Sequence, residues 1–415
     1  MRRGPWLERT LAIALALTTL VGCAAPLRMA RVPAPEAPGF ARTVAAVSSS
    51  MTARGRVTHF WCDPDSIYAA RLEDVRQARR TIHFETYFMT PGRRADDFAA
   101  ALIERARAGV TVRFLADADG AKEMPPSYWQ RLADAGVEVR LYHPFQWHQF
   151  WTYNTRTHRK LLLIDGKVGF TGGTGVSDHW DGHEHGAPWC DVELRLEGPV
   201  ITKLEGIFAQ HWTYVGGLAD LGPEVFRDHP EEGALLLVTP SSPTDGDSPV
   251  RALYHTSLRA AQQRIWIASP YFLPSPSESK ALAEAKRRGV DVRVLSVGPK
   301  NDKRPVYRAV QEHVSRLVLA GVPILEYQPA MMHAKVMLVD ERWVVTGSAN
   351  FDPRSFYHND ELTIATDDAE LAGQVEAFFQ DAFAQSRPLT RQYLDNRDFW
   401  TQAEGKLTLL LWWFL

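Results

Sequence analysis

The sequence predicts an α/β protein with two tandem units, each a mixed sheet flanked by helices, and three observations support this. Strand and helix patterns alternate from residue 66 to 142 and again from residue 253 to 326. Each stretch leads into a short hairpin with the same residue types. The stretches also share local sequence, such as Gly109-Val-Thr-Val-Arg and Gly289-Val-Asp-Val-Arg. Alternation is typical of sheets covered by helices on both faces, and the shared sequence indicates an internal duplication.

In the first unit, Ile67, Leu72 and Val75 recur at helical spacing and predict a helix that begins near Ser66. The next helices are each followed by a glycine, a residue that often ends a helix. The further elements expected are a strand at 81–88, a helix at 95–108, a strand at 110–115, a helix at 128–135 and a strand at 137–142.

The second unit repeats this order after a connection rich in Gly, Pro and acidic residues. Its expected elements are helices at 253–263, 278–288 and 306–320 and strands at 264–268, 290–295 and 321–326. We therefore expect a first unit at 57–216, a connection at 217–236, a second unit at 237–387 and a C-terminal tail at 388–415.

The hairpin of the second unit carries a concentrated set of reactive side chains. His333 and Lys335 begin an apolar run that ends at Asp340. Alternation along a strand places that His and Lys on the same face. The return strand then brings Ser348 and Asn350 next to them. An imidazole, an ammonium and two small hydrogen-bonding groups would surround one point.

The first unit carries the same pattern in His158, Lys160 and Asp165. Both copies read His-x-Lys, four residues, Asp, and a glycine follows seven residues after each Asp. A single His-x-Lys hairpin is more often a surface feature, but chance does not readily give two matched copies. The copies differ at one point, because Gly175 stands where the second copy has Asn350.

This double signature resembles the phospholipase D superfamily, and over residues 60–385 it is similar to the bacterial cardiolipin synthase branch. Other segments that match that branch are Glu85-Thr-Tyr87, Thr171-Gly-Gly173, Trp189-Cys-Asp191 with Glu197-Gly-Pro199, Gly347 to Ser355, and Asn359-Asp-Glu361. The resemblance implies that the two units pack as a pseudo-dimer, with the motif strands facing each other across the interface and one shared active site between them.

The resemblance also implies displacement at a phosphodiester through a covalent phosphohistidine. His158 is the expected nucleophile and His333 the expected general acid. Because lysines supply the positive charge, no cofactor and no metal are expected. The groups expected to hold the non-bridging phosphate oxygens are Lys160, Lys335, Ser348 and Asn350.

Each catalytic histidine also needs a partner on its other ring nitrogen to hold one tautomer. The resemblance implies Asp191 as the partner of His158 and Glu361 as the partner of His333. The two aspartates that close the motifs are expected to brace their own hairpins rather than to contact substrate.

The first 22 residues are predicted to be a signal peptide. Arg2 and Arg3 precede an 11-residue stretch of apolar residues and Thr, too short to span a membrane. Leu20-Val-Gly-Cys23 matches a bacterial lipobox, so Cys23 is the expected site of lipidation. The mature chain would be a lipoprotein on a membrane of the bacterial cell envelope, facing the periplasm or the exterior. Residues 23–56 are expected to be a flexible tether.

A cluster of histidines and acidic residues follows the first motif and could be interpreted as a metal site. Its irregular spacing and its glycines favour a solvated rim of the active site instead. The cluster consists of His179, Asp181, His183, Glu184 and His185.

Two apolar segments and two thiols complete the candidates. Residues 142–153 are dense in aromatics and are expected either in the core or as a lip at the mouth of the site. Residues 407–415 are too few to span a bilayer and too apolar for water, so they pack on the body or enter the membrane interface. Cys62 and Cys190 are expected to be free, buried thiols.

Composition favours a lipid over a nucleic acid as substrate, since 47 Lys and Arg against 49 Asp and Glu leave a net charge of −2. The leading interpretation is a phosphatidyltransferase that makes cardiolipin and glycerol from phosphatidylglycerol. Hydrolysis by the same site, as a phospholipase D or a nuclease, and lipid binding by an inactive site remain open alternatives. Nothing in the sequence indicates the oligomeric state.

Overall fold

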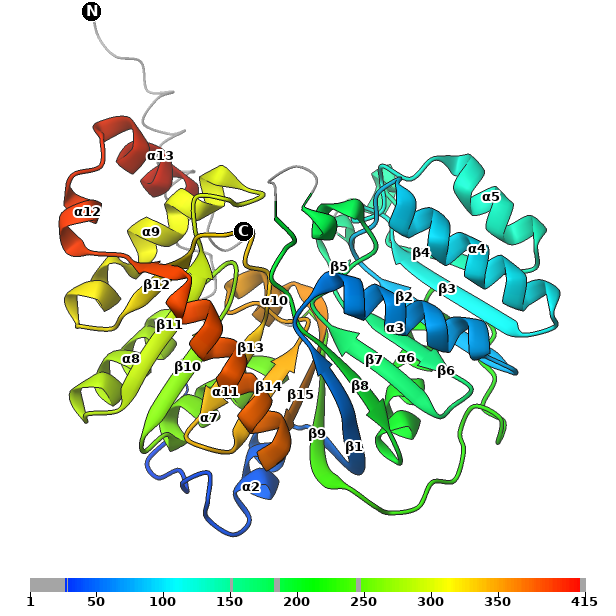
Figure 1. The fold of residues 1–415 in the computed structure, drawn as a ribbon, viewed down its shortest axis with the longest axis horizontal. Coiled ribbons are helices and arrows are strands. Elements are labelled where there is room, and N and C mark those ends of the chain that lie inside the picture. Colours follow the sequence, from blue (N-terminus) through cyan, green and yellow to red (C-terminus); the bar gives the residue numbers. More distant parts are fainter. Residues whose placement is uncertain (1–26, 28, 150–151, 183–186, 244–247, 411–415) are drawn as a thin grey trace, which may run out of the picture.

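The computed structural model describes residues 27, 29–149, 152–182, 187–243 and 248–410. A mixed sheet of sixteen strands runs through both halves of the chain, and helices cover both of its faces. In Figure 1 the first half lies to the right in blue to green, and the second half lies to the left in yellow to red. The predicted α/β class and tandem arrangement are confirmed.

The first half begins with strand β1, and each helix and strand expected between residues 66 and 142 is present. Its elements are β1 (Met51–Trp61), α3 (Pro64–Gln77), β2 (Thr81–Thr86), α4 (Arg93–Arg107), β3 (Thr111–Asp117), α5 (Pro126–Asp134), β4 (Glu138–Tyr142), β5 (Arg156–Thr157), β6 (Leu161–Ile164), β7 (Val168–Gly172), β8 (Glu193–Glu197) and α6 (Val200–Tyr214), with short 3-10 turns η1 (Trp147–Gln149), η2 (Thr152–Asn154) and η3 (Asp178–Asp181).

The second half follows the same plan and adds two helices at its end. Its elements are β9 (Ala234–Ser241), α7 (Pro249–Ala260), β10 (Arg264–Ala268), α8 (Pro276–Arg287), β11 (Asp291–Val297), α9 (Arg304–Leu319), β12 (Ile324–Tyr327), β13 (Val336–Val339), β14 (Trp343–Gly347), α10 (Pro353–Tyr357), β15 (Asn359–Thr366), α11 (Ala369–Ala384), β16 (Ser386–Pro388), α12 (Arg391–Asp395) and α13 (Phe399–Leu409).

The two halves have the same strand order. It reads β1-β8-β7-β6-β2-β3-β4 in the first half and β9-β15-β14-β13-β10-β11-β12-β16 in the second, which confirms the duplication. Strand β1 joins them, because residues 51–55 pair with β9 and residues 56–61 pair with β8. The changeover falls at Gly55, where a Cβ would lie 2.7 Å from Val200 and 2.8 Å from Leu236. Only glycine fits there without displacing the packing of both halves.

The expectation of a flexible tether at 23–56 is wrong for its second part. Helix α2 (Phe40–Val47) packs against α7 and β9, and Phe40 and Val44 are buried in the core of the second half. Strand β1 then crosses the centre of the sheet. The Ala-, Pro- and Arg-rich composition obscured this, because only three residues of α2 are buried.

The C-terminal tail also has more structure than its sequence indicated. Helix α13 packs along α9, and Gly405 permits the close approach, since a Cβ there would lie 2.7 Å from the Arg308 carbonyl oxygen. Residues 411–415, the end of the predicted apolar segment, lie outside the described residues. Among the residues that the structure describes, no helix is both long and apolar enough to cross a bilayer.

The motif aspartates, Asp165 and Asp340, are not in the active site. Each follows the far end of its motif strand, and five residues at about 3.3 Å each separate Asp165 from Lys160 by roughly 16 Å. Both have a left-handed backbone, with φ of 55° and 51°. Their carboxylates do not brace their own hairpins. They accept backbone N–H groups from the connection between a helix and the adjacent strand. These donors are Arg79, Arg80 and Thr81 for the first half and Gln262, Gln263 and Arg264 for the second.

We expect Asp340→Ala to lower the free energy of unfolding by about 2 kcal/mol, because it leaves three partly buried backbone N–H groups without their acceptor. Asp340→Asn is the matched control, since it keeps an acceptor oxygen and tolerates a positive φ. Urea unfolding measures both variants. Turnover per folded molecule should stay at the wild-type level, and a large loss of turnover with unchanged stability would show that Asp340 acts in catalysis.

Candidate functional site

Both motif histidines lie in one pocket between the halves. His158 and Lys160 precede β6, and His333 and Lys335 precede β13. The pocket has a volume of about 250 Å³ and is lined by both histidines and Lys160. The expectation of one shared active centre is therefore confirmed in its geometry.

Backbone hydrogen bonds between the halves hold both histidines. The N–H of His158 donates to the carbonyl of Asp360 in the second half over 2.8 Å. The N–H of His333 donates to the carbonyl of Cys190 in the first half over 2.7 Å. Asp360 precedes Glu361, and Cys190 precedes Asp191. Each histidine is thus pinned next to a carboxylate of the opposite half.

The pairing of histidines with carboxylates is the reverse of the one expected. His158 Nδ1 lies 3.0 Å from both carboxylate oxygens of Glu361, and His333 Nδ1 lies 2.7 Å from Asp191 Oδ2. The assignment of Asp191 to His158 and Glu361 to His333 assumed a partner within the same half. The pseudo-twofold packing places the opposite half's carboxylate closer. Because both Nδ1 atoms are engaged, the Nε2 atoms are the ones that can face the substrate, and that of His333 also lies 3.0 Å from Lys335 Nζ.

Ser348 has a different role from the one expected. Its hydroxyl donates to Glu361 Oε2 over 2.5 Å, and it accepts the N–H of Leu362 over 3.0 Å. Ser348 is fully buried. It therefore orients the carboxylate that orients His158, and it is not placed as a phosphate ligand. On the other side, Asp191 is held by the Trp180 indole N–H and by the N–H of Val192, both over 2.9 Å.

Asn350 fits the phosphate-binding role better, through its side-chain NH₂ group, because phosphate oxygens accept hydrogen bonds and an amide nitrogen donates them. Its side chain is largely buried beside the site. Its counterpart Gly175 allows no larger residue, because a Cβ there would lie 2.5 Å from the Phe88 carbonyl oxygen. The site is therefore asymmetric, with an amide on the second-half side only.

The two lysines are buried within the site. Lys160 Nζ donates to the His158 carbonyl over 2.7 Å, and Lys335 Nζ lies 2.9 and 3.0 Å from the two ring nitrogens of His333. Burial first, and then the charge of Lys335, lowers the pKa of Lys160 to about 7. Burial lowers the pKa of Lys335 to about 8, although nearby carboxylates oppose this. Buried ammonium groups with few fixed partners are suited to an anionic ligand.

The histidines are neutral at pH 7 in the empty site. Burial lowers the pKa of His158 to about 4, and the lysine charges add to this while Glu361 opposes it. Burial and Lys335 lower the pKa of His333 to about 4. Burial opposes ionisation of Asp191 and Glu361, but the adjacent histidines and lysines keep the pKa of both below the usual range. At pH 7 the two carboxylates therefore face Lys335, which is mostly ionised, and Lys160, which is ionised in about half of the molecules.

Aromatic residues form walls that sequence reasoning did not assign. Tyr87 lies edge-on to His158, with ring centroids 5.1 Å apart. Trp180 and Trp189 flank His333 at 5.3 and 5.5 Å. Tyr87 and Trp189 belong to two segments that match the family, Glu85-Thr-Tyr87 and Trp189-Cys-Asp191, and this match was the available signal. Trp180 had no signal, since it belongs to the loop interpreted as a solvated rim.

The described members of the histidine and acid cluster are engaged elsewhere. His179 Nδ1 lies 2.6 Å from the Ser177 hydroxyl, and Asp181 forms ion pairs with Arg93 and Arg94. Residues 183–185 lie outside the described residues. Among the residues that the structure describes, no group of three or more potential ligands is arranged to hold a metal ion.

The aromatic stretch 142–153 divides between core and surface. Tyr142 is buried, whereas Phe145 and Trp147 are 66% and 80% exposed. Tyr153 donates to Asp119 at the rim of the pocket over 2.7 Å. Trp151 lies outside the described residues.

The two thiols are free, as expected, but neither is fully buried. Cys62 is exposed and Cys190 is half-buried.

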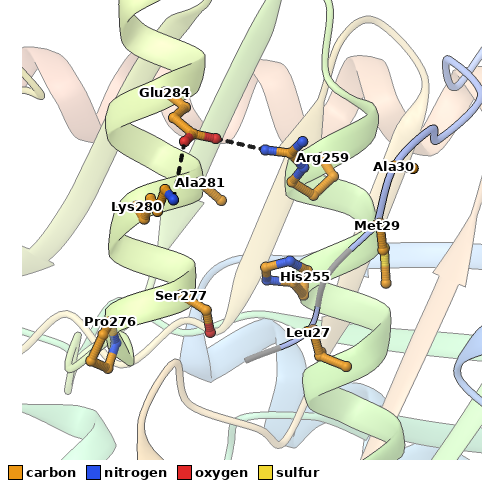
Figure 2. A pocket seen from close by; sticks show the side chains of 10 residues that line it. All are labelled: Leu27, Met29, Ala30, His255, Arg259, Pro276, Ser277, Lys280, Ala281 and Glu284. Atoms are coloured by element: carbon orange, nitrogen blue, oxygen red, sulfur yellow. Dashed lines mark hydrogen bonds and ion pairs between the residues drawn. The ribbon is translucent and has the colours of Figure 1, made fainter. Parts of the chain in front are cut away.

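A larger hollow of about 640 Å³ lies away from this chemistry (Figure 2). It lies between α7 and α8, under Leu27 and Met29. Its cations, Arg259 and Lys280, both pair with Glu284. The smaller pocket is the candidate active site, because it holds both motif histidines.

Comparisons with known proteins agree with this geometry. The family described as "Cardiolipin synthase, PLD-like domain" matches residues 72–184 and 254–383. Cardiolipin synthase A of Pseudomonas putida (strain GB-1) is 36% identical over 337 residues, which are 80% of this chain and 68% of the relative. Cardiolipin synthase A of Pseudomonas entomophila (strain L48) is 35% identical over 339 residues, 81% of this chain and 70% of the relative.

Solved structures are similar in fold. The phosphatidylserine synthase of Haemophilus influenzae Rd KW20 superposes with a TM-score of 0.67 at 12% identity, over 90% of this chain and 99% of that one. The polyphosphate kinase of Porphyromonas gingivalis gives a TM-score of 0.53 at 12% identity, over 92% of this chain and 56% of that one. At this identity the likeness extends to the fold alone.

Proposed function

Because the chain belongs to the cardiolipin synthase family of phospholipase D-like proteins, we propose that it transfers a phosphatidyl group from one phosphatidylglycerol to a hydroxyl of a second, with release of glycerol. One observation supports this chemistry above all. Two buried histidines, each fixed through Nδ1 by a carboxylate of the opposite half, share a pocket with Lys160, and the buried Lys335 contacts His333. That arrangement supplies a nucleophile, an acid and an anion site.

In the first step, the Nε2 lone pair of His158 attacks phosphorus and forms a P–N bond. The bond between phosphorus and the glycerol oxygen breaks, and His333 gives its Nε2 proton to that oxygen. In the second step, a hydroxyl of another phosphatidylglycerol attacks phosphorus and gives its proton to His333. The P–N bond breaks, so both histidines return to their starting states.

Substrate binding raises the proton affinity of His333, which takes its proton from the solvent. In the empty site the charges of Asp191 and Glu361 face Lys335 and a partly ionised Lys160. A bound phosphodiester adds one negative charge in a low-dielectric pocket, which favours uptake of one proton. His333 can therefore gain its proton as the substrate arrives, and the lysines and Asn350 hold the non-bridging oxygens.

The crossed pairing predicts different losses for the two carboxylates. Asp191→Asn acts on the acid, so turnover of natural lipid should fall about 100-fold or more, with partial retention on a diester that has an acidic leaving group. Glu361→Gln acts on the nucleophile and should lose both activities. Steady-state rates on the two substrates measure this. The opposite pattern would exchange the roles of His158 and His333, and equal partial activity of both variants would exclude the covalent route.

We further propose that the chain is a lipoprotein of the cell envelope, anchored through Cys23 and assisted by exposed apolar side chains. Phe399, Trp400 and Leu407 of α13 are 73%, 77% and 66% exposed. Glu404 of α13 pairs with Arg308, one turn from Lys303 at the rim of the pocket. Two weak membrane contacts together hold a protein far better than one.

Labelled fatty acid should be incorporated into the wild-type chain and not into Cys23→Ser, because the lipobox offers that thiol for acylation. Fractionation should then move part or all of the variant away from membranes. A wild-type protein that never acquires the label would remove the lipoprotein proposal without touching the catalytic one.

Formation of cardiolipin rather than phosphatidic acid requires the phosphohistidine to survive until a lipid hydroxyl arrives. Water must be excluded, and the acceptor must come from the bilayer. Exposed Trp147, close in sequence to the first motif, is suited to seat the pocket mouth at the interface. Trp147→Ser, or deletion of 407–415, should therefore lower the ratio of cardiolipin to phosphatidic acid.

Mass spectrometry of lipids after incubation with phosphatidylglycerol vesicles measures that ratio. Hydrolysis of a short soluble diester should be largely retained by both variants, because the pocket itself is unchanged. Leu218→Ser is the matched surface control, since Leu218 is 83% exposed but lies in the connection between the halves. Phosphatidic acid as the sole product of the wild type would replace the synthase proposal with a phospholipase D.

A further inference from the structure

A buried ionic network lies directly behind one of the two histidines. His211 of α6 is 7% exposed, and both of its ring nitrogens face carboxylates. Its Nδ1 lies 2.8 Å from Glu85 Oε1 of β2, and its Nε2 lies 3.2 Å from Asp360 Oδ1 of β15. Glu85 belongs to the first half and Asp360 to the second. His211 therefore bridges the two halves.

The geometry requires His211 to be an imidazolium. Ionised carboxylates only accept hydrogen bonds, so both ring nitrogens must carry a proton. Burial and Arg159 oppose the charge, but Glu85 and Asp360 raise the pKa of His211 above its usual value. Burial raises the pKa of Asp360, but its contacts with His211, Arg159 and Ser242 hold that pKa well below its usual value.

The network is neutral as a whole, because two carboxylates face two cations. Arg159 lies 3.7 Å from Asp360, which also accepts the hydroxyls of Tyr142 over 2.7 Å and Ser242 over 2.6 Å. The Tyr142 ring stacks on His211 with centroids 5.3 Å apart. Loss of the His211 proton would leave one uncompensated negative charge in a buried cluster, which is costly.

The network contacts the catalytic machinery at two points. Thr157, which donates its hydroxyl to Glu85, precedes His158 in the chain. Asp360 precedes Glu361, and its carbonyl accepts the His158 N–H. The nucleophile and its orienting carboxylate are therefore each one residue from a member of the network.

The other histidine has no such support. Glu85 pairs with the first residue of β6, and Ala268 pairs with the first residue of β13, so Ala268 is the counterpart of Glu85. Cys190 is the counterpart of Asp360, because each precedes the orienting carboxylate. An apolar side chain and a thiol thus stand behind His333 where carboxylates stand behind His158.

We propose that His211 is a positioning residue of the reaction: its bridge between Glu85 and Asp360 holds the halves in register behind His158 and fixes the nucleophile against Glu361. The proposal rests on the assignment of His158 as the nucleophile. It predicts that the charge of His211, and not only its packing, is required for formation of the phosphohistidine.

A double-mutant cycle on the full-length protein tests this. His211→Gln leaves two carboxylates against one guanidinium, and phosphoenzyme formation on a short soluble diester should slow about tenfold or more. Glu85→Gln added to His211→Gln restores neutrality, so the double variant should be several-fold faster than His211→Gln alone. Single-turnover rates, with trapping of the phosphoenzyme, separate this effect from substrate binding.

His83→Gln is the matched control. His83 of β2 is buried, and its Nδ1 lies 2.7 Å from Glu205 Oε2 of α6. This pair joins the same two elements as His211 and Glu85, but here the histidine is on β2 and the glutamate on α6. The hydrogen-bond and ring contacts of His83 among the described residues are with Glu205, Arg113 and Phe208 of the first half. Phosphoenzyme formation should therefore stay near the wild-type rate at a temperature where all variants are folded.

Two results would overturn the proposal. If the rate losses of Glu85→Gln and His211→Gln were additive, or if His83→Gln lost as much rate as His211→Gln, His211 would contribute only through packing. A neutral His211 at pH 7, seen by ¹⁵N-histidine spectra assigned with the His211→Gln variant, would exclude the charged bridge. The soluble-diester readout does not depend on cardiolipin, so failure of the synthase proposal in vesicles would be distinguishable from failure of this one.

Discussion

The structure depends on one arrangement, the exchange of histidine partners between the halves. His158 needs Glu361 and His333 needs Asp191, so neither half can fix the tautomer of its own catalytic histidine. The sheet serves this exchange. Strand β1 pairs with both halves, and a shared core packs α6 and α11 against strands of both. A displacement of one half by a fraction of a hydrogen-bond length would disturb both catalytic groups at once.

Duplication gives the site two equivalent backbone arrangements, one from each half, but the side chains on them differ. Only the second half supplies an amide, Asn350, whereas Gly175 is confined by the Phe88 carbonyl. Only His158 has an ionic network behind it. Two chemically identical imidazoles can therefore take different roles, because their surroundings rather than their own structures determine what each can do.

Much of the fold followed from sequence because its signals are local. Periodic apolar residues and helix-ending glycines predicted the repeated helices and strands, and the duplicated motif identified both histidines and both lysines. Helix α2 and strand β1 were missed, since α2 buries few residues and β1 gains its stability from partners distant in sequence. The crossed pairing was assigned wrongly for the same reason. Motif spacing reports neighbours within one half, and the deciding contacts lie between halves.

Charge balance links these observations to the chemistry. Burial opposes the charge of both lysines and of both carboxylates, and the opposite charges in the site offset part of this cost. Burial also lowers the pKa of both histidines to about 4, so the empty site contains two neutral imidazoles. In such a site neutral His158 can act as a nucleophile at once, whereas His333 can act as an acid only after an anionic substrate has bound. The negative charge of the substrate phosphate favours protonation of His333. The general acid is therefore formed when a phosphodiester is bound and ready to be cleaved.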